Sequence, residues 1–278
     1  MSVQSSSFKN SPALKLVHGA SEAVVLLHGA HVMSWKPEGH DEQLYSSDAA
    51  DYSPGSAIRG GIPLCFPQFG MMGELPMHGF VRNQVWEKTG ESDAPDSSSV
   101  TLALRDSEAT RKMWNHPFVT ELVLTLGKNC MRVDLKVRNT GSTAFTFRSA
   151  FHTYLRVPDV GQAEITGLKG ISCHDKAKDE HYADPEDVLR IDRLIERIYS
   201  PVEKGVVLRT ADYALAIDSE NMPDAVVWNP WMERAVQIPD FPDDGYRTMV
   251  CIESAVIATP VTLAPGNGWQ GSQILTIS

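Results

Sequence analysis

Alternation of apolar and polar residues dominates this chain. Residues 131–138 read Met-Arg-Val-Asp-Leu-Lys-Val-Arg and alternate without a break, which is typical of a β-strand with one face in water. A second apolar-rich run, residues 121–126, is separated from the first by Gly127, Lys128 and Asn129. This spacing predicts a β-hairpin.

Similar short runs, punctuated by turn residues, recur along the chain and predict about fifteen strands. The other expected strands include 23–27, 32–35, 84–88, 100–105, 144–148, 163–166, 206–209, 214–218, 225–228, 248–253, 260–263 and 273–277. Many short strands at this spacing favour a large antiparallel β-sandwich over alternating strand–helix units.

Helical signals are few. Residues 107–114 predict a short helix with Ser107 as its N-cap. The apolar positions of residues 185–198 fit either a helix or two short strands, and the pattern does not decide between them. Since neither a low-complexity linker nor an internal repeat divides the chain, we expect residues 1–278 to form a single domain.

Composition narrows the function. The chain has 278 residues, of which 42% are hydrophobic and 22% charged, as in ordinary globular proteins. Its formal net charge is −10, and it lacks the basic runs that bind nucleic acids or anionic membranes. We therefore expect neither partner. A small phosphorylated ligand stays possible, because a few arginines can reverse the local potential.

Cysteine usage and the N-terminal sequence favour a cytoplasmic location. The four cysteines are scattered at Cys65, Cys130, Cys173 and Cys251, unlike a disulfide scaffold. The first residues show no signal-peptide pattern. The longest strongly apolar run, residues 23–27, is far too short to span a bilayer.

Glycine, proline, histidine and arginine are concentrated in residues 57–70 and 77–83. Glycine and proline interrupt regular strands and let backbone approach a ligand. Arg59 and Arg82 bracket this region, and each can place two donors on a phosphate or on sugar hydroxyls. Surface ion pairs are the alternative for both.

Two further segments carry candidate chemistry. His152 lies in the apolar, aromatic run 149–156, where it is either a buried core residue or a catalyst. Glu253 ends a hydrophobic strand within 250–255, where a carboxylate costs several kcal/mol unless it is paired or functional.

Other catalytic templates are missing from the sequence. It has no zinc-binding spacing, phosphate-binding loop, nucleophile elbow or dinucleotide fingerprint. His28 and His31 are three residues apart in a turn-like segment, but no third ligand lies nearby. We expect neither a metal nor a cofactor. A glycosidase-like pair of carboxylates stays open, because such residues meet only in the fold.

Seven motifs carry a resemblance that covers nearly the whole chain. In order they are IRGGIPLCFPQFG (58–70), HGFVRN (78–83), FHTYLRV (151–157), ERIY (196–199), VWNPW (227–231), CIESA (251–255) and LAPGNGW (263–269). Together they resemble the hexose-6-phosphate mutarotase branch of the aldose 1-epimerase superfamily. The resemblance implies a galactose-mutarotase-like antiparallel β-supersandwich with its site on the concave face. It also implies an isomerase that interconverts the α and β anomers of a hexose 6-phosphate, with glucose 6-phosphate first.

The resemblance also implies roles for matching residues. His152 corresponds to the general acid that protonates the ring oxygen, and Glu253 to the base that takes the proton of the anomeric hydroxyl. Arg59 and Arg82 match substrate- and phosphate-binding arginines, and His78 matches a sugar-holding histidine. These inferences place the acid and the base on opposite sides of the sugar ring.

Two positions depart from the family pattern. Glu196 stands where the family usually has an aspartate that binds sugar hydroxyls, and the extra methylene shifts its reach. Met77 stands where a polar sugar contact is common, and its thioether cannot donate a hydrogen bond. Both departures bear on the choice of hexose.

Two alternatives remain open from the sequence. The first is an epimerase of unphosphorylated hexoses, and the second is a non-catalytic carbohydrate-binding protein on the same fold. For the hexose-6-phosphate epimerase itself the expected partner is a small-molecule sugar phosphate, and we expect a monomer.

Overall fold

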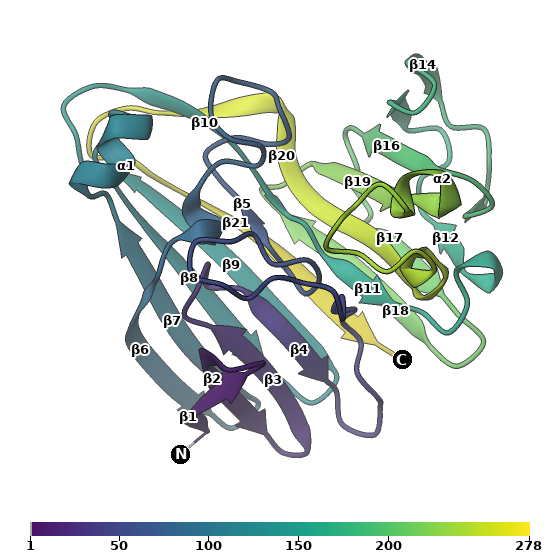
Figure 1. Ribbon diagram of the computed structural model, residues 1–278, viewed down its shortest axis with the longest axis horizontal. Helices are drawn as coiled ribbons and strands as arrows, with labels where there is room; N and C mark the ends of the chain where they lie inside the picture. The colour runs from purple at the N-terminus through teal and green to yellow at the C-terminus, as the bar shows by residue number, and fades with distance from the viewer. Residues whose placement is uncertain (1) are drawn as a thin grey trace.

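The computed structural model describes residues 2–278 as three β-sheets with two short α-helices (Figure 1). Every pairing between named strands is antiparallel, for example β8 (Phe118–Leu126) with β9 (Cys130–Asn139). This pair is the hairpin that the alternating pattern predicts, and every second residue of β8 is buried. The all-β, antiparallel prediction is therefore confirmed.

Four strands form the first sheet, in chain order: β1 (Val3–Phe8), β2 (Ser11–His18), β3 (Ser21–Leu26) and β4 (Val32–Lys36). It lies against β7 and β8 of the second sheet (Figure 1). The second sheet has nine strands, in the order β15 (Leu189–Arg190), β12 (Glu164–Thr166), β17 (Val206–Arg209), β18 (Ala214–Glu220), β21 (Gly268–Ile277), β9, β8, β7 (Ser97–Arg105) and β6 (Glu87–Ala94).

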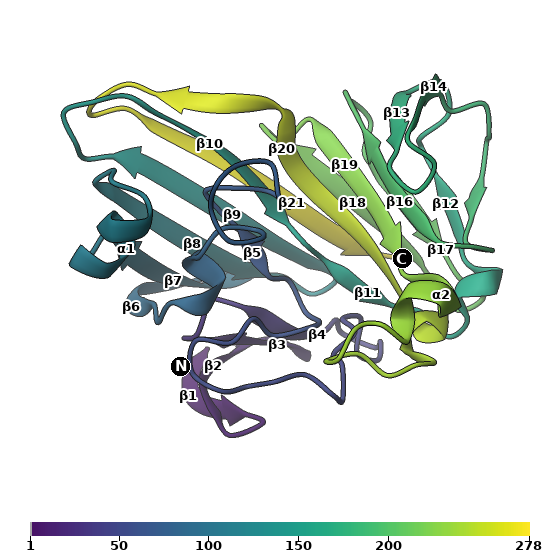
Figure 2. The ribbon, with the colours of Figure 1, turned by 45° about the horizontal axis from the view of Figure 1, so that its top comes forward.

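The third sheet has eight strands and carries the candidate site. Seven follow the order β14 (Glu180–Ala183), β13 (Ser172–Asp175), β16 (Ile195–Tyr199), β19 (Asp224–Asn229), β20 (Met249–Leu263), β10 (Phe145–Phe151) and β5 (Leu64–Cys65). The eighth, β11 (Tyr154–Arg156), also pairs with β20. Figure 2 shows β20 crossing the middle of the molecule beside β10 and β19.

Helices are short and peripheral. The α-helices are α1 (Glu108–Met113) and α2 (Trp231–Ala235), and single 3₁₀ turns form η1 (Val81–Asn83), η2 (Val160–Gln162) and η3 (Gly245–Thr248). The helix predicted near Ser107 is confirmed, because the Ser107 hydroxyl accepts from the backbone N–H of Thr110 as an N-cap. No helix among residues 2–278 is long and apolar enough to cross a membrane.

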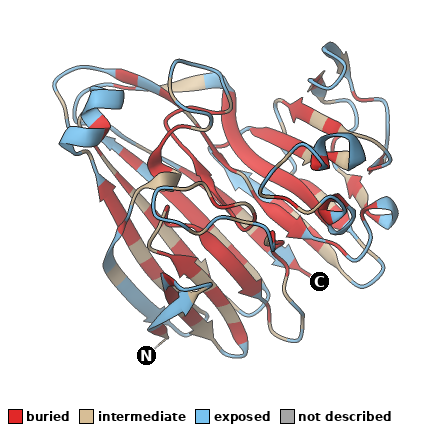
Figure 3. Ribbon diagram, viewed as in Figure 1, coloured by how far each residue is buried: buried red, intermediate tan, exposed pale blue. Residues whose placement is uncertain are grey.

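The core lies between the sheets. The largest cluster of buried apolar side chains draws on all three, with Leu16, Leu124 and Phe147 as examples. Figure 3 shows the central strands buried and α1 largely exposed. Packing between sheets, rather than within one, therefore accounts for most of the buried apolar surface.

The structure settles one open choice of secondary structure and corrects the bounds of two predicted strand segments. Residues 185–198 contain two short strands, β15 and β16, rather than a helix. The two strands expected at 248–253 and 260–263 are one long strand, β20, in which Pro260 lies where the register with β10 is irregular and no ladder bond is required of it. The strand expected at 84–88 begins only at Glu87, because η1 turns the chain just before it.

Candidate active site

Glu253 is buried in the middle of the third sheet. It lies on β20 opposite Val226 of β19, and Cys251 and Ala255 flank it on the same face, two residues away on either side. Its side chain is only 1% exposed. Burial among these groups, with a smaller contribution from the negative charge of Glu196, raises the pKa of Glu253 well above its usual range.

His152 lies beside this carboxylate. It occupies the break between β10 and β11, and its Nε2 is 3.5 Å from Glu253 Oε1. Its ring stacks on Tyr154 with a centroid distance of 4.8 Å and meets Trp228 edge-on at 6.0 Å. Burial lowers the pKa of His152 well below 6.5, and the positive charges of Arg59 and Arg82 contribute in the same direction.

Both members of this pair keep an unpaired polar atom. Within residues 2–278, neither His152 Nδ1 nor Glu253 Oε2 has a hydrogen-bond partner, although both atoms are buried. A buried polar atom without a partner costs about 1–3 kcal/mol. At this position both atoms are free to bond a ligand that enters beside the pair.

A buried polar network supports the pair from behind. Thr153 follows His152, Ser254 follows Glu253, and both point to the opposite face of the sheet. Gln273 of β21 joins them: its Oε1 accepts from the Thr153 hydroxyl, and its Nε2 donates to Ser254 Oγ over 3.0 Å. The second sheet therefore fixes the separation of the imidazole and the carboxylate.

His78 lies against His152, with ring centroids 5.3 Å apart. Its Nδ1 accepts from the backbone N–H of Gly70 over 3.2 Å and contacts Cys65 Sγ at 3.1 Å. Burial, together with the nearby charges of Arg82 and Arg59, lowers the pKa of His78 to about 3. The ring is therefore neutral, and its proton lies on Nε2, which can donate to a ligand.

Arg59 reaches the site through Tyr154. Its Nε and Nη2 both donate to Asp240 Oδ1 over 3.0 Å, and its Nη1 donates to the Tyr154 hydroxyl over 3.1 Å. The ion pair considered from the sequence is thus present. Two of the five guanidinium N–H groups remain for a ligand.

Arg82 lies on η1, and its Nη2 donates to the backbone carbonyl of Met77 over 2.8 Å. The Met77 side chain itself is exposed. Residue 77 therefore binds Arg82 only through its backbone carbonyl. The methionine side chain at this position does not alter that hydrogen bond.

Glu196 is held by two cations. Its Oε1 accepts from Lys176 Nζ over 2.6 Å, and its Oε2 accepts from Arg234 Nη1 over 2.7 Å. It lies directly opposite Trp228 in the sheet, which links it to His152. The structure thus brings together the six residues predicted from the sequence around His152.

Sequence reasoning missed several members of this cluster. Tyr154 and Trp228 lie inside motifs already singled out, so a signal for them existed. Asp240, Lys176 and Arg234 lie outside the seven motifs, and only the fold places them beside Arg59 and Glu196. Apart from the His152–Glu253 pair, the site holds four cationic side chains and two carboxylates: Arg59, Arg82, Lys176, Arg234, Asp240 and Glu196. It is therefore locally positive in a protein of net charge −10.

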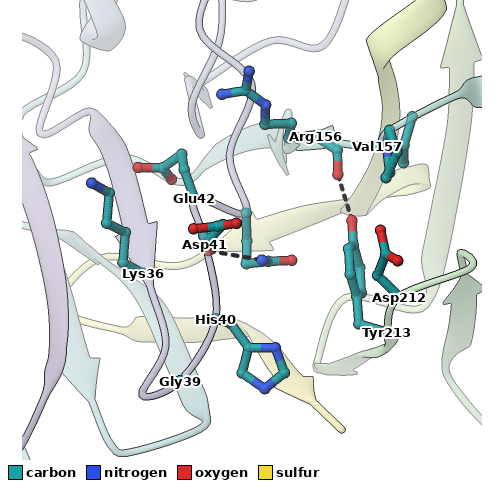
Figure 4. Close-up of a pocket in the computed structure, with 11 residues that line it drawn as sticks. Lys36, Gly39, His40, Asp41, Glu42, Arg156, Val157, Asp212 and Tyr213 are labelled. Atoms are coloured by element: carbon teal, nitrogen blue, oxygen red, sulfur yellow. Dashed lines mark hydrogen bonds between the residues drawn. The ribbon is translucent and has the colours of Figure 1, made fainter.

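A large surface hollow of about 650 Å³ lies elsewhere, between the end of β4 and residues 212–213 (Figure 4). The Tyr213 hydroxyl donates to the carbonyl of Arg156 there. The carboxylate of Glu42 accepts from the Ser34 hydroxyl and from two backbone N–H groups. None of the six residues predicted from the sequence lines this hollow. Among residues 2–278, no group of three His, Cys, Asp or Glu side chains is arranged to hold a metal ion.

Comparison with known proteins agrees with the motifs. The sequence model of the family described as "Aldose 1-epimerase" matches residues 12–276. A protein of Cenchrus ciliaris is 34% identical over 262 residues, 90% of this chain and 79% of its own. One of Escherichia coli K12 is 35% identical over 244 residues, 86% of this chain and 81% of its own. Both bear the name "Putative glucose-6-phosphate 1-epimerase".

A solved structure agrees as well. The crystal structure of a protein of Salmonella typhimurium, titled a "putative mutarotase", superposes with a TM-score of 0.91 at 28% identity. The match covers 99% of this chain and 93% of that one. The resemblance drawn from the seven motifs is thereby confirmed: the chain is an epimerase that belongs to the aldose 1-epimerase family.

Proposed function

We propose that this epimerase interconverts the α and β anomers of a hexose 6-phosphate, with glucose 6-phosphate as its first substrate. The observation that carries this proposal is the contact of His152 with Glu253, at 3.5 Å, beside the two arginines. The names of the two relatives, from Cenchrus ciliaris and Escherichia coli, support the same sugar phosphate.

The spacing of the pair suits ring opening. Anomers exchange when the O1 proton is removed, O5 is protonated, and the C1–O5 bond breaks to give an open-chain aldehyde. O1 and O5 are both bonded to C1, so the groups that serve them must be neighbours. The 3.5 Å contact of His152 with Glu253 supports this arrangement, and the placement of the two groups on opposite sides of the ring stays a prediction.

Burial of the pair favours the open-chain state. When Glu253 takes the O1 proton and His152 gives its proton to O5, both side chains become neutral. The raised pKa of Glu253 and the lowered pKa of His152 favour that same neutral pair. Reclosure reverses both transfers after rotation about C1–C2, so no outside proton source is required. Each positioned group contributes about 10²–10⁴-fold to the rate.

The arginines support a phosphorylated substrate. Arg59 and Arg82 both retain guanidinium N–H groups beyond those bound within the chain. Hydrogen bonds to charged groups contribute about 1.5–3 kcal/mol each. Two such bonds would favour the phosphorylated sugar by roughly 10²–10⁴-fold, because 1.4 kcal/mol corresponds to a factor of ten.

The experiment is an anomerisation assay with freshly dissolved α-glucose 6-phosphate and α-glucose, each corrected for its spontaneous rate. We expect kcat/KM to be at least about 10²-fold higher for the phosphate. Mannose and galactose 6-phosphates then rank the hexoses. Equal acceleration of glucose and its phosphate would overturn the phosphate assignment, and no acceleration of either would overturn the proposal as a whole.

A further inference from the structure

The segment His28–His31, which the sequence offered as a weak metal motif, contacts both arginine-bearing segments. His28 Nε2 lies 2.8 Å from the carbonyl oxygen of Ser56, and His31 Nε2 lies 2.7 Å from that of Gly60. A carbonyl only accepts, so both nitrogens carry protons. The two histidines therefore bind the backbone before Arg59, at Ser56, and directly after it, at Gly60.

The same turn lies against the backbone of Arg82. The N–H of Gly29 donates to the carbonyl of Gln84 over 2.7 Å, and His28 forms a β-bridge with Val85. A Cβ atom added to Gly29 would lie 2.5 Å from the carbonyl oxygen of Arg82. Only glycine permits this approach, both for space and because its φ is +73°.

A third contact joins the two arginine segments to each other. The side-chain amide of Asn83, the residue after Arg82, donates to the carbonyl of Gly55 over 2.7 Å. Gly55 precedes Ser56, the residue whose carbonyl His28 holds. The turn, η1 and the Arg59 segment therefore form one closed set of contacts.

We infer that His31 and Gly29 are positioning residues that set the separation of Arg59 and Arg82, and thereby the affinity for the phosphate group of the substrate. Neither residue needs to touch the sugar. Loss of the His31 bond frees the carbonyl next to Arg59, and a side chain at position 29 displaces the backbone of Arg82. This inference rests on the phosphate-binding role proposed above for the two arginines.

Gly29→Ala and Gly39→Ala provide a matched test. Both glycines have positive φ, +73° and +79°, but a Cβ at Gly39 meets nothing within 4 Å. Backbone strain is therefore common to the two variants, whereas contact with Arg82 is specific to Gly29→Ala. We expect Gly29→Ala to raise KM for glucose 6-phosphate about tenfold, the loss of one charged hydrogen bond. Its kcat and its KM for glucose should change little, and Gly39→Ala should leave all three near wild type.

His31 allows a second test by conservative rescue. His31→Phe fills the space without a donor, while His31→Gln keeps an N–H near the position of Nε2. We expect His31→Phe to weaken competitive inhibition by inorganic phosphate about tenfold and His31→Gln to restore it. Thermal unfolding of each variant shows that it is folded when assayed.

The outcomes separate this inference from the proposed function. If the wild type shows no preference for the phosphorylated sugar, the proposed function fails. If it shows the preference and Arg82→Ala abolishes it, but Gly29→Ala and His31→Phe keep wild-type KM and phosphate inhibition, the positioning role is overturned. An equal rise of KM for glucose and for its phosphate would overturn it as well.

Discussion

The His152–Glu253 pair and the two arginines are held by different kinds of structure. Glu253 lies on β20, which is paired with β10 and β11 on one side and with β19 on the other. His152 lies in the break between β10 and β11, and Gln273 connects the residues that follow each member of the pair. The arginines lie on non-strand segments held by side-chain bonds to backbone carbonyls. Because the supports differ, substitutions within the sheets should affect the chemical step, whereas substitutions in the His28–His31 turn should affect recognition of the phosphate.

The largest effect is expected at the pair. Glu253→Gln and His152→Asn should each lower kcat by at least about 10²-fold, because each removes one of the two proton transfers. KM should change much less. Anomerisation rates, with thermal unfolding as a check on the fold, measure this. A near-normal rate in a folded variant would remove that residue from the mechanism.

Arg82→Ala should affect recognition instead. We expect KM for glucose 6-phosphate to rise roughly 10–100-fold, since one or more charged hydrogen bonds are lost, while KM for glucose changes little. Arg105, an exposed arginine of β7, provides the control, and Arg105→Ala should leave both constants unchanged. If Arg82→Ala damages both substrates equally, the residue has no particular role toward phosphate.

The charges around Glu253 should move the pH dependence of kcat in opposite directions. Glu196 raises the pKa of Glu253 and Lys176 lowers it. Glu196→Gln should therefore shift the limb of the profile that reports Glu253 to lower pH, and Lys176→Met should shift it to higher pH. Each shift should be about one pH unit or less. Shifts in the same direction would show that the limb reports another group.

The smallest effect on activity is expected from His31→Gln, which should instead change stability in acid. The pKa of His31 is lowered to about 3 by burial, so below pH 6.5 the unfolded chain binds a proton that the folded protein does not. Stability is then lost as the pH falls from 6.5 toward 3. Glutamine does not titrate, so the free energy of unfolding should fall less between neutral pH and about pH 5. An equal fall in both proteins, measured by urea unfolding, would contradict this.

Local patterns predicted local elements well. Strict alternation located the β8–β9 hairpin, and Ser107 located α1 through its cap. The edge strands β1 and β14 were missed because most of their residues are exposed and show little apolar alternation. The ambiguous residues 185–198 became strands because β16 pairs with β13 and β19, and neither pairing can be read from the segment itself.

The sequence motifs identified the candidate site residues, but only the fold showed which side chains contact them. His152 and Glu253 were found as separate unusual residues, and nothing in the sequence gave their separation. Asp240 could not be connected with Arg59, because 181 positions separate the two along the chain. A side chain that orients or neutralises another group cannot be recognised in a single sequence, because its role depends on a contact that forms only when the chain folds.

The ion pair of Lys176 with Glu196 has a consequence for the lifetime of the enzyme. A ring-opened sugar presents a free aldehyde, and an amine with an available lone pair would condense with it to an imine and block the site. The Lys176 ammonium donates to the Glu196 carboxylate over 2.6 Å, so its nitrogen lone pair is occupied by a proton and does not attack a carbonyl. Under the ring-opening mechanism proposed above, this contact keeps the Lys176 amine from forming an imine with the open-chain sugar.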